Sequence, residues 1–419
     1  MRGTAALQGE RAACAWIEGK GMMQRSWTDR ISRLGWERAT ERPIAWRAPW
    51  RHLDPVAVLA ACALSGFGLA AIYSATFASL HLQRLPGGMF MHRQLISLLF
   101  GLLAMAMVTL VDYRRLAAWT PVLYGLMVLV LGAVLTPLGS QANGAQSWFA
   151  LGPFQLQPSE FAKVGLIVTL AAILGTWREQ AGRPGLRRLG LALAALALVG
   201  GEILLQPDFG TMMVFVAITF GILLSSGIRF RWLLVLALIG GIGVVGMFKL
   251  NVLKEYQKQR LTAFVNPSVD AGGQGFTYNY RQSLIAIGSG GVSGKGYLRG
   301  TQTNLQYVPE QRTDFIFTVV GEELGFLGAA ALLALLGLLV WRGMRIAVLA
   351  SDPLGALIAA GVVSMVVFQT FVNVGMTIGI MPITGIPLPF VSYGGSSLVA
   401  NFMAVGLLEN IHMRRYLSA

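Results

Sequence analysis

The sequence predicts an all-α polytopic membrane protein with about ten transmembrane helices, because its composition and its apolar runs both argue against a soluble domain. Hydrophobic residues make up 55% of the 419-residue chain and charged residues only 12%. Soluble domains carry roughly 25% charged residues. Apolar runs of about 17 to 27 residues, each long enough to cross a hydrocarbon core of about 30 Å as a helix, fill nearly everything after Asp54.

The predicted spans follow one another through short connections, with one exception. They are 55–73, 94–111, 119–138, 161–177, 189–205, 209–225, 232–248, 315–341, 354–381 and 396–411. The segment 251–313, between the seventh and eighth spans, has about sixty residues and is too long for a tight connection, so we expect a large extracytoplasmic loop with a function of its own. The domains are then a tail, 1–53, and a transmembrane domain, 54–415.

Arginine residues indicate the orientation. They recur in every second connection, at positions 114 and 115, 178 to 188, 229 and 231, 342 and 345, and 414 and 415. The positive-inside rule places these clusters and both termini in the cytoplasm. The basic segment 1–53 lacks the apolar core of a signal peptide, so it is expected to be a cytoplasmic tail on anionic lipid, a disordered extension or the product of a start codon placed too early.

Other features of the composition exclude several classes of site. The net charge of +14 is largely explained by the tail and the inner loops, so no nucleic-acid partner is expected. Cys14 lies in the tail and Cys62 in the first span, which implies no disulfide framework. The four histidines are scattered without the spacing of a zinc site.

The long loop is rich in cations and glycine. Arg260, Lys295 and Arg312 are prominent among its basic residues, which suits either a phosphorylated lipid headgroup or ordinary solvation. The stretch "IGSGGVSGKGYLRGT" fails the nucleotide phosphate-loop pattern, because Lys295 is followed by Gly296 and not by Ser or Thr. It is either a flexible turn or a backbone nest for a lipid-linked phosphate.

Carboxylates follow directly on this loop. Asp314 is expected to begin the eighth helix at the outer membrane surface, where it either caps the helix or faces a bound substrate. Glu322 is expected roughly two turns, or about 12 Å, deeper on a similar helix face. Charges inside a bilayer usually face a polar interior or a partner, so this side of the helix should not face lipid.

Further polar residues are predicted on the same side of the membrane. Glu160 and Lys163 are spaced to pair on one helix face, either for catalysis or to hold helices together. Asp208 falls on an external corner, and "MPITGIPLPFVSYGGSSL", which contains Ser392, is rich enough in Pro and Gly to be a re-entrant or broken segment. These elements could converge with Asp314 on one cavity.

Two amide side chains in the ninth predicted span are not expected to bind substrate. Gln369 and Asn373 lie four residues apart, and are better explained as interhelical hydrogen-bond partners than as substrate ligands.

The motifs together resemble one family. The stretches "LQPSEFAK", "QPDFGT", "GKGYLRGTQTNLQYVPEQRTDFIF" and "MPITGIPLPFVSYGGSS" are similar, in order, to the SEDS family of shape, elongation, division and sporulation proteins. The resemblance covers about 54–415 and not the tail. Within the family, the last two stretches resemble the RodA branch more than the FtsW branch.

The resemblance implies a bacterial inner-membrane peptidoglycan glycosyltransferase. Such an enzyme polymerises lipid II outside the membrane with inversion at the anomeric carbon, and works with a class B penicillin-binding protein. A magnesium or manganese ion is implied without defined ligands. Asp314 matches the essential acid of the "TDF" motif and is expected to be the general base. The implied substrate-binding residues are Glu160, Lys163, Asp208, Arg260, Lys295, Arg312 and Ser392.

One departure and two alternatives accompany this reading. Arg312 stands where the family often has His, which keeps a basic group. A lipid II flippase would also have many spans and an external basic basin, and it would lose transport when Glu322 is neutralised. A non-catalytic scaffold for a penicillin-binding protein would tolerate Asp314→Asn.

Overall fold

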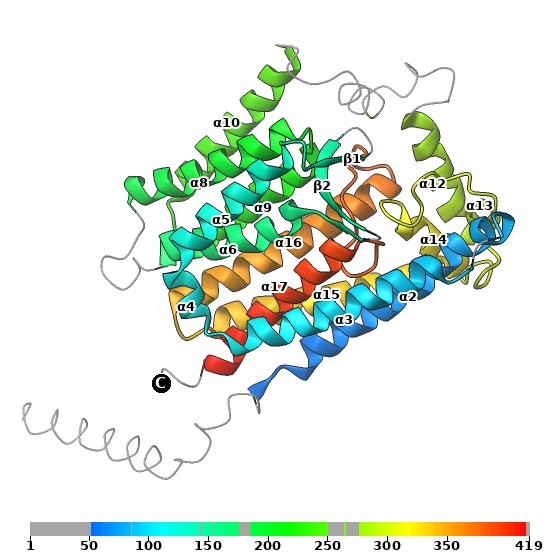
Figure 1. Ribbon diagram of the computed structural model, residues 1–419, viewed down its shortest axis with the longest axis horizontal. Coiled ribbons are helices and arrows are strands. Elements are labelled where there is room, and N and C mark those ends of the chain that lie inside the picture. The colour runs from blue at the N-terminus through cyan, green and yellow to red at the C-terminus, as the bar shows by residue number, and fades with distance from the viewer. Residues whose placement is uncertain are drawn as a thin grey trace, which may run out of the picture. The chain divides into compact units, whose positions relative to one another are not determined.

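The chain folds as a helix bundle with one small sheet (Figure 1). The computed structural model describes residues 52–84, 86–142, 145–152, 154–175, 185–249, 264 and 276–415, so the predicted tail lies outside the described residues. The helices are α2 (Pro55–Leu82), α3 (Met89–Leu110), α4 (Tyr113–Ala118), α5 (Thr120–Val134), α6 (Pro158–Gly175), α8 (Leu186–Leu205), α9 (Phe209–Ser225), α10 (Phe230–Lys249), α12 (Phe276–Gly290), α13 (Thr301–Asn304), α14 (Ile316–Glu323), α15 (Gly325–Leu349), α16 (Pro353–Thr377) and α17 (Gly395–Arg414).

Every predicted span coincides with helix, so the polytopic all-α prediction is confirmed. Among the described residues, six helices are long and apolar enough to cross a membrane by length and composition alone: α2, α3, α6, α8, α15 and α16. Helices α5 and α9 and the first part of α10 are shorter apolar helices. The predicted boundaries were less accurate, since α2 continues to Leu82 and α16 already ends at Thr377.

The prediction of one continuous eighth helix is wrong. The helix is divided into α14 and α15 at Leu324 and Gly325, where Gly325 has a φ of 65°. Backbone from the preceding loop packs into this break: Phe326 N donates to Gly291 O at 2.9 Å, and Leu327 N donates to Val292 O at 3.1 Å. Loop carbonyls therefore accept hydrogen bonds from the first N–H groups of α15.

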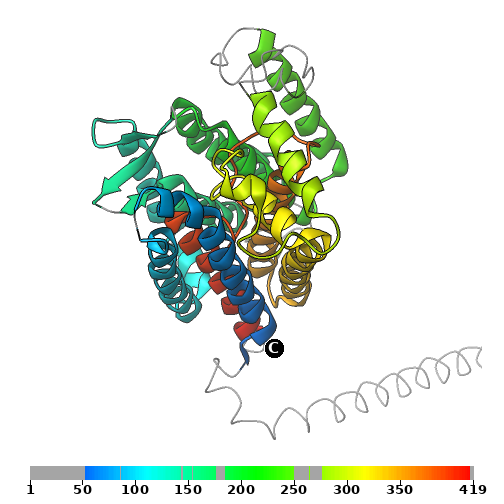
Figure 2. The same ribbon diagram turned by 90° about the vertical axis from the view of Figure 1, so that its right-hand side faces the viewer.

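Three short strands, which the sequence analysis did not predict, lie between α5 and α6. β1 (Ser140–Ala142), β2 (Ala145–Leu151) and β3 (Phe154–Leu156) form an antiparallel sheet in the order β1-β2-β3. The long loop likewise contains helices α12 and α13. Figure 2 shows the sheet on one side of the bundle and α12 to α14, in yellow-green and yellow, on another. We call the end of the bundle with the sheet the hairpin end.

Small residues allow the central helices to approach closely. Helix α17 packs along α3, and α16 packs against α6, α9 and α15. A side chain at Gly101 would meet the Phe402 ring at 2.9 Å, and one at Gly406 would meet the Met105 carbonyl oxygen at 2.7 Å. Glycine lets the backbones of α3 and α17 touch, as is common between membrane helices.

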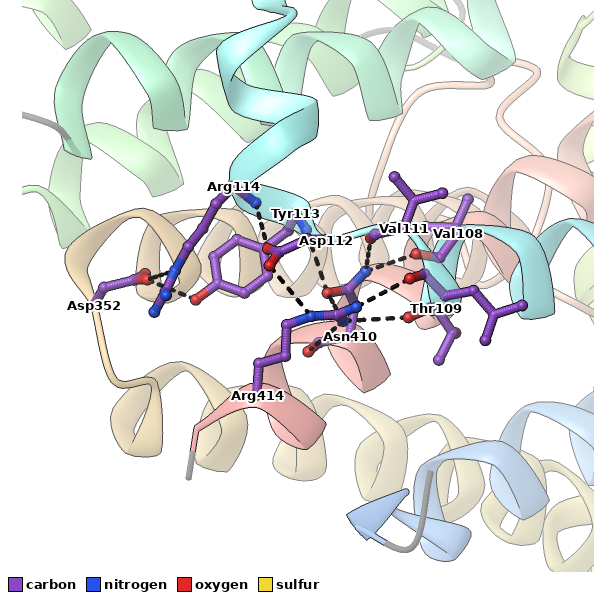
Figure 3. Close-up of polar contacts among 10 residues, drawn as sticks. Val108, Thr109, Val111, Asp112, Tyr113, Arg114, Asp352, Asn410 and Arg414 are labelled. Carbon is purple, nitrogen blue, oxygen red and sulfur yellow. Dashed lines mark hydrogen bonds and ion pairs between the residues drawn. The ribbon is translucent and has the colours of Figure 1, made fainter. Parts of the chain in front are cut away.

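Polar contacts fasten the opposite end of the bundle, where α17 ends (Figure 3). Tyr113 Oη donates to Asp352 Oδ2 at 2.6 Å, and Arg114 Nε lies 2.9 Å from the same oxygen. Arg414 Nε lies 3.6 Å from Asp112 Oδ2, and its guanidinium group also donates to carbonyls at the end of α3. These contacts join the α3–α4 turn, the start of α16 and the end of α17.

Candidate active site

A cavity of about 1810 Å³ opens at the hairpin end of the bundle and continues between α9, α10 and α16. Its wall includes Glu160 at the start of α6, Asp208 in the turn between α8 and α9, Asp314 before α14, and much of the segment 382–397. The predicted convergence of these elements on one cavity is therefore confirmed. The volume exceeds the roughly 300–1,000 Å³ typical of pockets for small molecules, which favours a large ligand.

Asp314 lies half-buried in the cavity wall, two residues before α14 begins. Phe315 occupies the N-cap position of that helix and makes no side-chain capping bond. The expectation that Asp314 begins or caps the eighth helix is therefore wrong. Its carboxylate belongs to a loop, and its position depends on what holds that loop.

Hydrogen bonds to the backbone hold this loop in place. Three consecutive carbonyl groups, those of residues 312, 313 and 314, each accept a bond from another part of the site. The donors are Tyr393 N to Arg312 O at 2.9 Å, Ser392 Oγ to Thr313 O at 2.6 Å, and Asn373 Nδ2 to Asp314 O at 2.8 Å. We call these three bonds the carbonyl clamp. The clamp fixes the backbone from which the Asp314 side chain projects.

Two predicted residues therefore act on this loop. Asn373 is fully buried in α16, and its amide group also donates to Ile386 O at 2.8 Å, which links the clamp to the segment after α16. The prediction that Gln369 and Asn373 bond between helices is wrong: Asn373 donates to carbonyls of two loops, and the buried amide of Gln369 has no hydrogen-bond partner among the described residues. Ser392, predicted as a substrate ligand, is not among the cavity-lining residues, and its Oγ also accepts from Leu388 N at 2.8 Å.

Glu160 and Lys163 form the predicted ion pair, with 2.8 Å between Nζ and Oε1. Both side chains are almost completely buried, and only Glu160 lines the cavity. Because both residues belong to α6, their bond does not itself join two helices. Removing one partner from a buried pair typically costs about 3–5 kcal/mol, since it leaves an uncompensated charge.

Asp208 is the N-cap of α9. Its carboxylate accepts from Thr211 N at 3.0 Å, from Thr211 Oγ1 at 2.7 Å and from Gln157 Nε2 at 3.2 Å. Burial raises the pKa of this carboxyl, and the two bonds from Thr211 oppose that shift. Asp208 thus joins the start of α9 to the segment just before α6.

Two arginine side chains are among the described residues that line the cavity, Arg93 and Arg312. The Arg312 guanidinium group lies 4.3 Å from the centre of the Phe90 ring, which orients it by a cation–π contact. The sequence analysis missed Arg93, which lies in the first turns of α3, because its predicted second span began one residue later. The available signal was an arginine just before a span at the end that the positive-inside rule predicts to be external, where few arginines are expected.

Two other predicted cations are not in this wall. Arg260 lies outside the described residues. Lys295 pairs with Glu322, at 2.8 Å between Nζ and Oε1, away from the cavity lining. The Glu322 carboxylate also accepts bonds from the start of α13: Gln302 N at 2.9 Å and Thr303 N at 2.9 Å.

One expectation about this region and one of two alternatives are wrong. Asp314 lies before α14, so Glu322 does not share a helix face with it, and the Glu322 carboxylate accepts a bond from the start of α13. The glycine stretch is not an open phosphate nest, since Lys295 N and Gly296 N donate to the carbonyls of Glu322 and Glu323 at 3.0 and 2.9 Å. We call this contact between the segment 290–296 and the α14–α15 break the glycine clasp.

The donor set limits how the site could hold a metal ion. Among the described residues there is no group of three or more His, Cys, Asp or Glu side chains placed to bind one ion. Magnesium commonly binds through one or two carboxylates and completes its shell with water and substrate phosphates. The cavity carboxylate of Asp314 fits that arrangement.

Comparisons with known proteins agree with this architecture. The family model of the FtsW, RodA and SpoVE cell cycle proteins matches residues 55–417. The chain is 38% identical to stage V sporulation protein E of Bacillus subtilis, over 85% of this chain and 96% of that protein. It is 36% identical to peptidoglycan glycosyltransferase MrdB of Escherichia coli, over 87% of this chain and 94% of that protein.

A solved structure supports the same assignment. The structure is described as "Structural coordination of polymerization and crosslinking by a peptidoglycan synthase complex". One of its chains superposes on this protein with a TM-score of 0.72 at 34% identity. The match covers 87% of this chain and 98% of that chain. Sequence, fold and cavity thus agree, and the chain belongs to the SEDS family of FtsW, RodA and SpoVE cell cycle proteins.

Proposed function

We propose that this chain is a peptidoglycan glycosyltransferase that polymerises lipid II, with Asp314 as the general base. The observation that carries the proposal is the cavity that opens at the hairpin end. Asp314, Arg93 and Arg312 all line this cavity. Forming a β-1,4 bond from an α-linked pyrophosphate by direct displacement requires a base for the attacking hydroxyl group and positive charge for the leaving group.

The residues divide between these tasks. The carboxylate of Asp314 accepts the proton of the attacking 4-hydroxyl group, while Arg93 and Arg312 hold the pyrophosphate oxygens. Glu160, held by Lys163, and Asp208 also line the cavity and orient the sugars by hydrogen bonds. The carbonyl clamp keeps the base in position, which matters because small displacements of a reacting group cost large factors in rate.

An apolar groove extends the cavity between helices α9, α10 and α16. Large apolar side chains line it while remaining exposed: Phe220 on α9, Ile239 on α10 and Phe371 on α16. Helix α10 packs against the bundle chiefly through α9 (Figure 1). A polyprenyl chain attached to the pyrophosphate suits such a groove, because burying apolar surface is favourable by roughly 25 cal/mol per Å².

A divalent cation is part of the proposal. Among the residues that the structure describes, four carboxylates and two guanidinium groups line the cavity, and the substrate adds a pyrophosphate. Such a bound ion supplies positive charge that stabilises the departing pyrophosphate. A cavity carboxylate would hold the ion together with the substrate phosphates.

The cellular setting follows from the same reading. We place the hairpin end outside the cytoplasmic membrane and both termini inside, because the arginine clusters lie at the opposite end. A class B penicillin-binding protein is the proposed partner that crosslinks the strands. We assign the chain to the RodA branch, which acts in elongation and rod shape.

The test is glycan-strand formation from purified lipid II, with magnesium or manganese and a cognate penicillin-binding protein that lacks glycosyltransferase activity. Asp314→Asn should lower the rate by at least about a hundredfold, the lower end of what a general base contributes. Glu310→Gln is the matched control, because Glu310 lines the same cavity on the same loop, and it should retain most activity.

Each alternative function predicts another result. If the wild type makes polymer and Asp314→Asn makes as much, Asp314 is not the base. If the wild type makes none in an assay validated with an active relative, transport or scaffolding replaces polymerisation. The contrast first expected between Asp314 and a mid-membrane Glu322 does not separate a flippase from a polymerase, because Glu322 braces α13 and Lys295.

A further inference from the structure

The small sheet at the hairpin end has no part in the mechanism described so far, yet it forms part of the cavity wall. Trp148 on β2, Gln155 on β3 and Gln157 just after β3 all line the cavity that contains Asp314. The sheet is too short to cross a membrane, and antiparallel pairing holds its strands in register, with Ala150 opposite Gln155.

The sheet is fixed to the cavity at its base. Gln157 N donates to Ser396 Oγ at 3.0 Å, and Ser396 Oγ donates to Gln155 O at 3.2 Å, which ties β3 to the start of α17. Gln157 Nε2 reaches Asp208 at 3.2 Å. The backbone from Gln155 to Gln157 is therefore anchored to the start of α17, and the Gln157 side chain is anchored to Asp208.

The side chains on this wall are suited to sugar rings. Trp148 is partly exposed in the wall, so it presents a broad flat apolar surface with one N–H donor. Gln155 is exposed, and its amide group offers both donors and an acceptor. A pyranose has an apolar face of C–H groups and a rim of hydroxyl groups that donate and accept. A lipid chain would need no amides, and a phosphate would need cations.

We propose that Trp148 and Gln155 form a saccharide-binding subsite for the glycan, in which the indole stacks on a pyranose ring and the amide binds its hydroxyl groups. This subsite rests on the proposed function. It adds to the proposed site two residues that hold sugar at a distance from the bond being formed. It predicts that the hairpin sets the affinity for glycan and the length of strands, while Asp314 sets the chemistry.

The direct test measures binding without turnover. The full chain carrying Asp314→Asn is placed in detergent micelles, and a lipid-free GlcNAc–MurNAc tetrasaccharide is titrated by saturation-transfer NMR. Trp148→Ala should weaken binding about three- to tenfold, and Trp148→Phe should restore most of it because it keeps a flat ring. Trp148→Leu should not restore it, since leucine is apolar without being planar.

Controls separate this subsite from other roles of tryptophan. Trp119→Ala removes an exposed tryptophan that is not part of the cavity wall, and it should leave binding unchanged. Equal binding by Trp148→Ala and the parent chain, or full rescue by leucine, overturns the subsite. In the active chain, Trp148→Ala should shorten the glycan strands and raise the apparent KM with little change in kcat.

The two proposals fail in different ways. If the wild type polymerises lipid II while Trp148→Ala matches it in tetrasaccharide affinity and strand length, the subsite is wrong and the glycosyltransferase stands. If the wild type binds the tetrasaccharide through Trp148 but makes no polymer, the saccharide site stands and the proposed reaction is wrong.

Discussion

At the scale of single residues, the site depends on side chains that hold backbone as much as on those that face the cavity. Asn373 shows this most clearly, because its amide group donates to both Asp314 O and Ile386 O at 2.8 Å. A buried carbonyl that loses its donor costs about 1–3 kcal/mol. The position of the proposed base therefore depends on a residue that does not line the cavity.

We predict that Asn373→Ala lowers kcat for polymerisation about ten- to a hundredfold, because Asp314 loses its clamp and shifts in the site. Asn401→Ala is the matched control: Asn401 is also a buried asparagine, on α17, and its amide donates only weakly, to Ser397 Oγ at 3.4 Å. Thermal unfolding is recorded for both variants. A kcat of Asn373→Ala equal to that of Asn401→Ala at similar stability would contradict a positioning role.

At the scale of elements, the glycine clasp explains why the eighth span breaks. Gly294 and Gly325 both have positive φ, and a side chain on either would overlap backbone atoms of the facing segment. The clasp uses the N–H groups of Lys295 and Gly296, and Glu322 fastens α13 beside it. The segment 290–296 is thereby fixed against the end of α14, the helix that directly follows the segment carrying Asp314.

A pair of glycines tests the clasp. Gly294 has a φ of 78°, and a Cβ there would lie 2.1 Å from Glu323 O. Gly291 has a φ of 57° with open space around it. Gly291→Ala should lower the free energy of unfolding by only roughly 1–2 kcal/mol, the cost of a left-handed backbone conformation for a residue with a Cβ. Gly294→Ala must also displace the facing backbone. This second variant should therefore unfold at a clearly lower temperature and lose activity. Equal thermal shifts would show that the clasp is loose.

At the scale of the whole molecule, the two ends of the bundle differ in what they carry. The end where α17 ends has arginine residues paired across elements. Arg114 pairs with Asp352 (Figure 3), and Arg342 pairs with Asp54. The hairpin end has the cavity and its carboxylates. Polymerising a substrate outside the cell requires the second end to be external.

Cysteine labelling tests this orientation in spheroplasts, in a background with Cys14→Ser and Cys62→Ser. Leu305→Cys places an exposed thiol at the hairpin end, just after α13, and should react with a membrane-impermeant maleimide. Ser351→Cys, exposed between α15 and α16 at the other end, should react only after permeabilisation. The reverse pattern would invert the proposed topology and place the cavity in the cytoplasm.

The sequence by itself determined the class of fold, because crossing a membrane requires long apolar helices and these are local in the chain. It also determined the Glu160–Lys163 pair, since three residues of helix fix that contact. Only the tertiary structure decided the contacts between segments that are far apart in the sequence. Asn373 reaches Asp314 O across fifty-nine positions, Glu322 turns toward α13 and Lys295, and Trp148 enters the cavity wall through a sheet that apolar periodicity did not reveal. Hydrogen bonds between such segments have no local signature, so the arrangement of the site had to come from the fold.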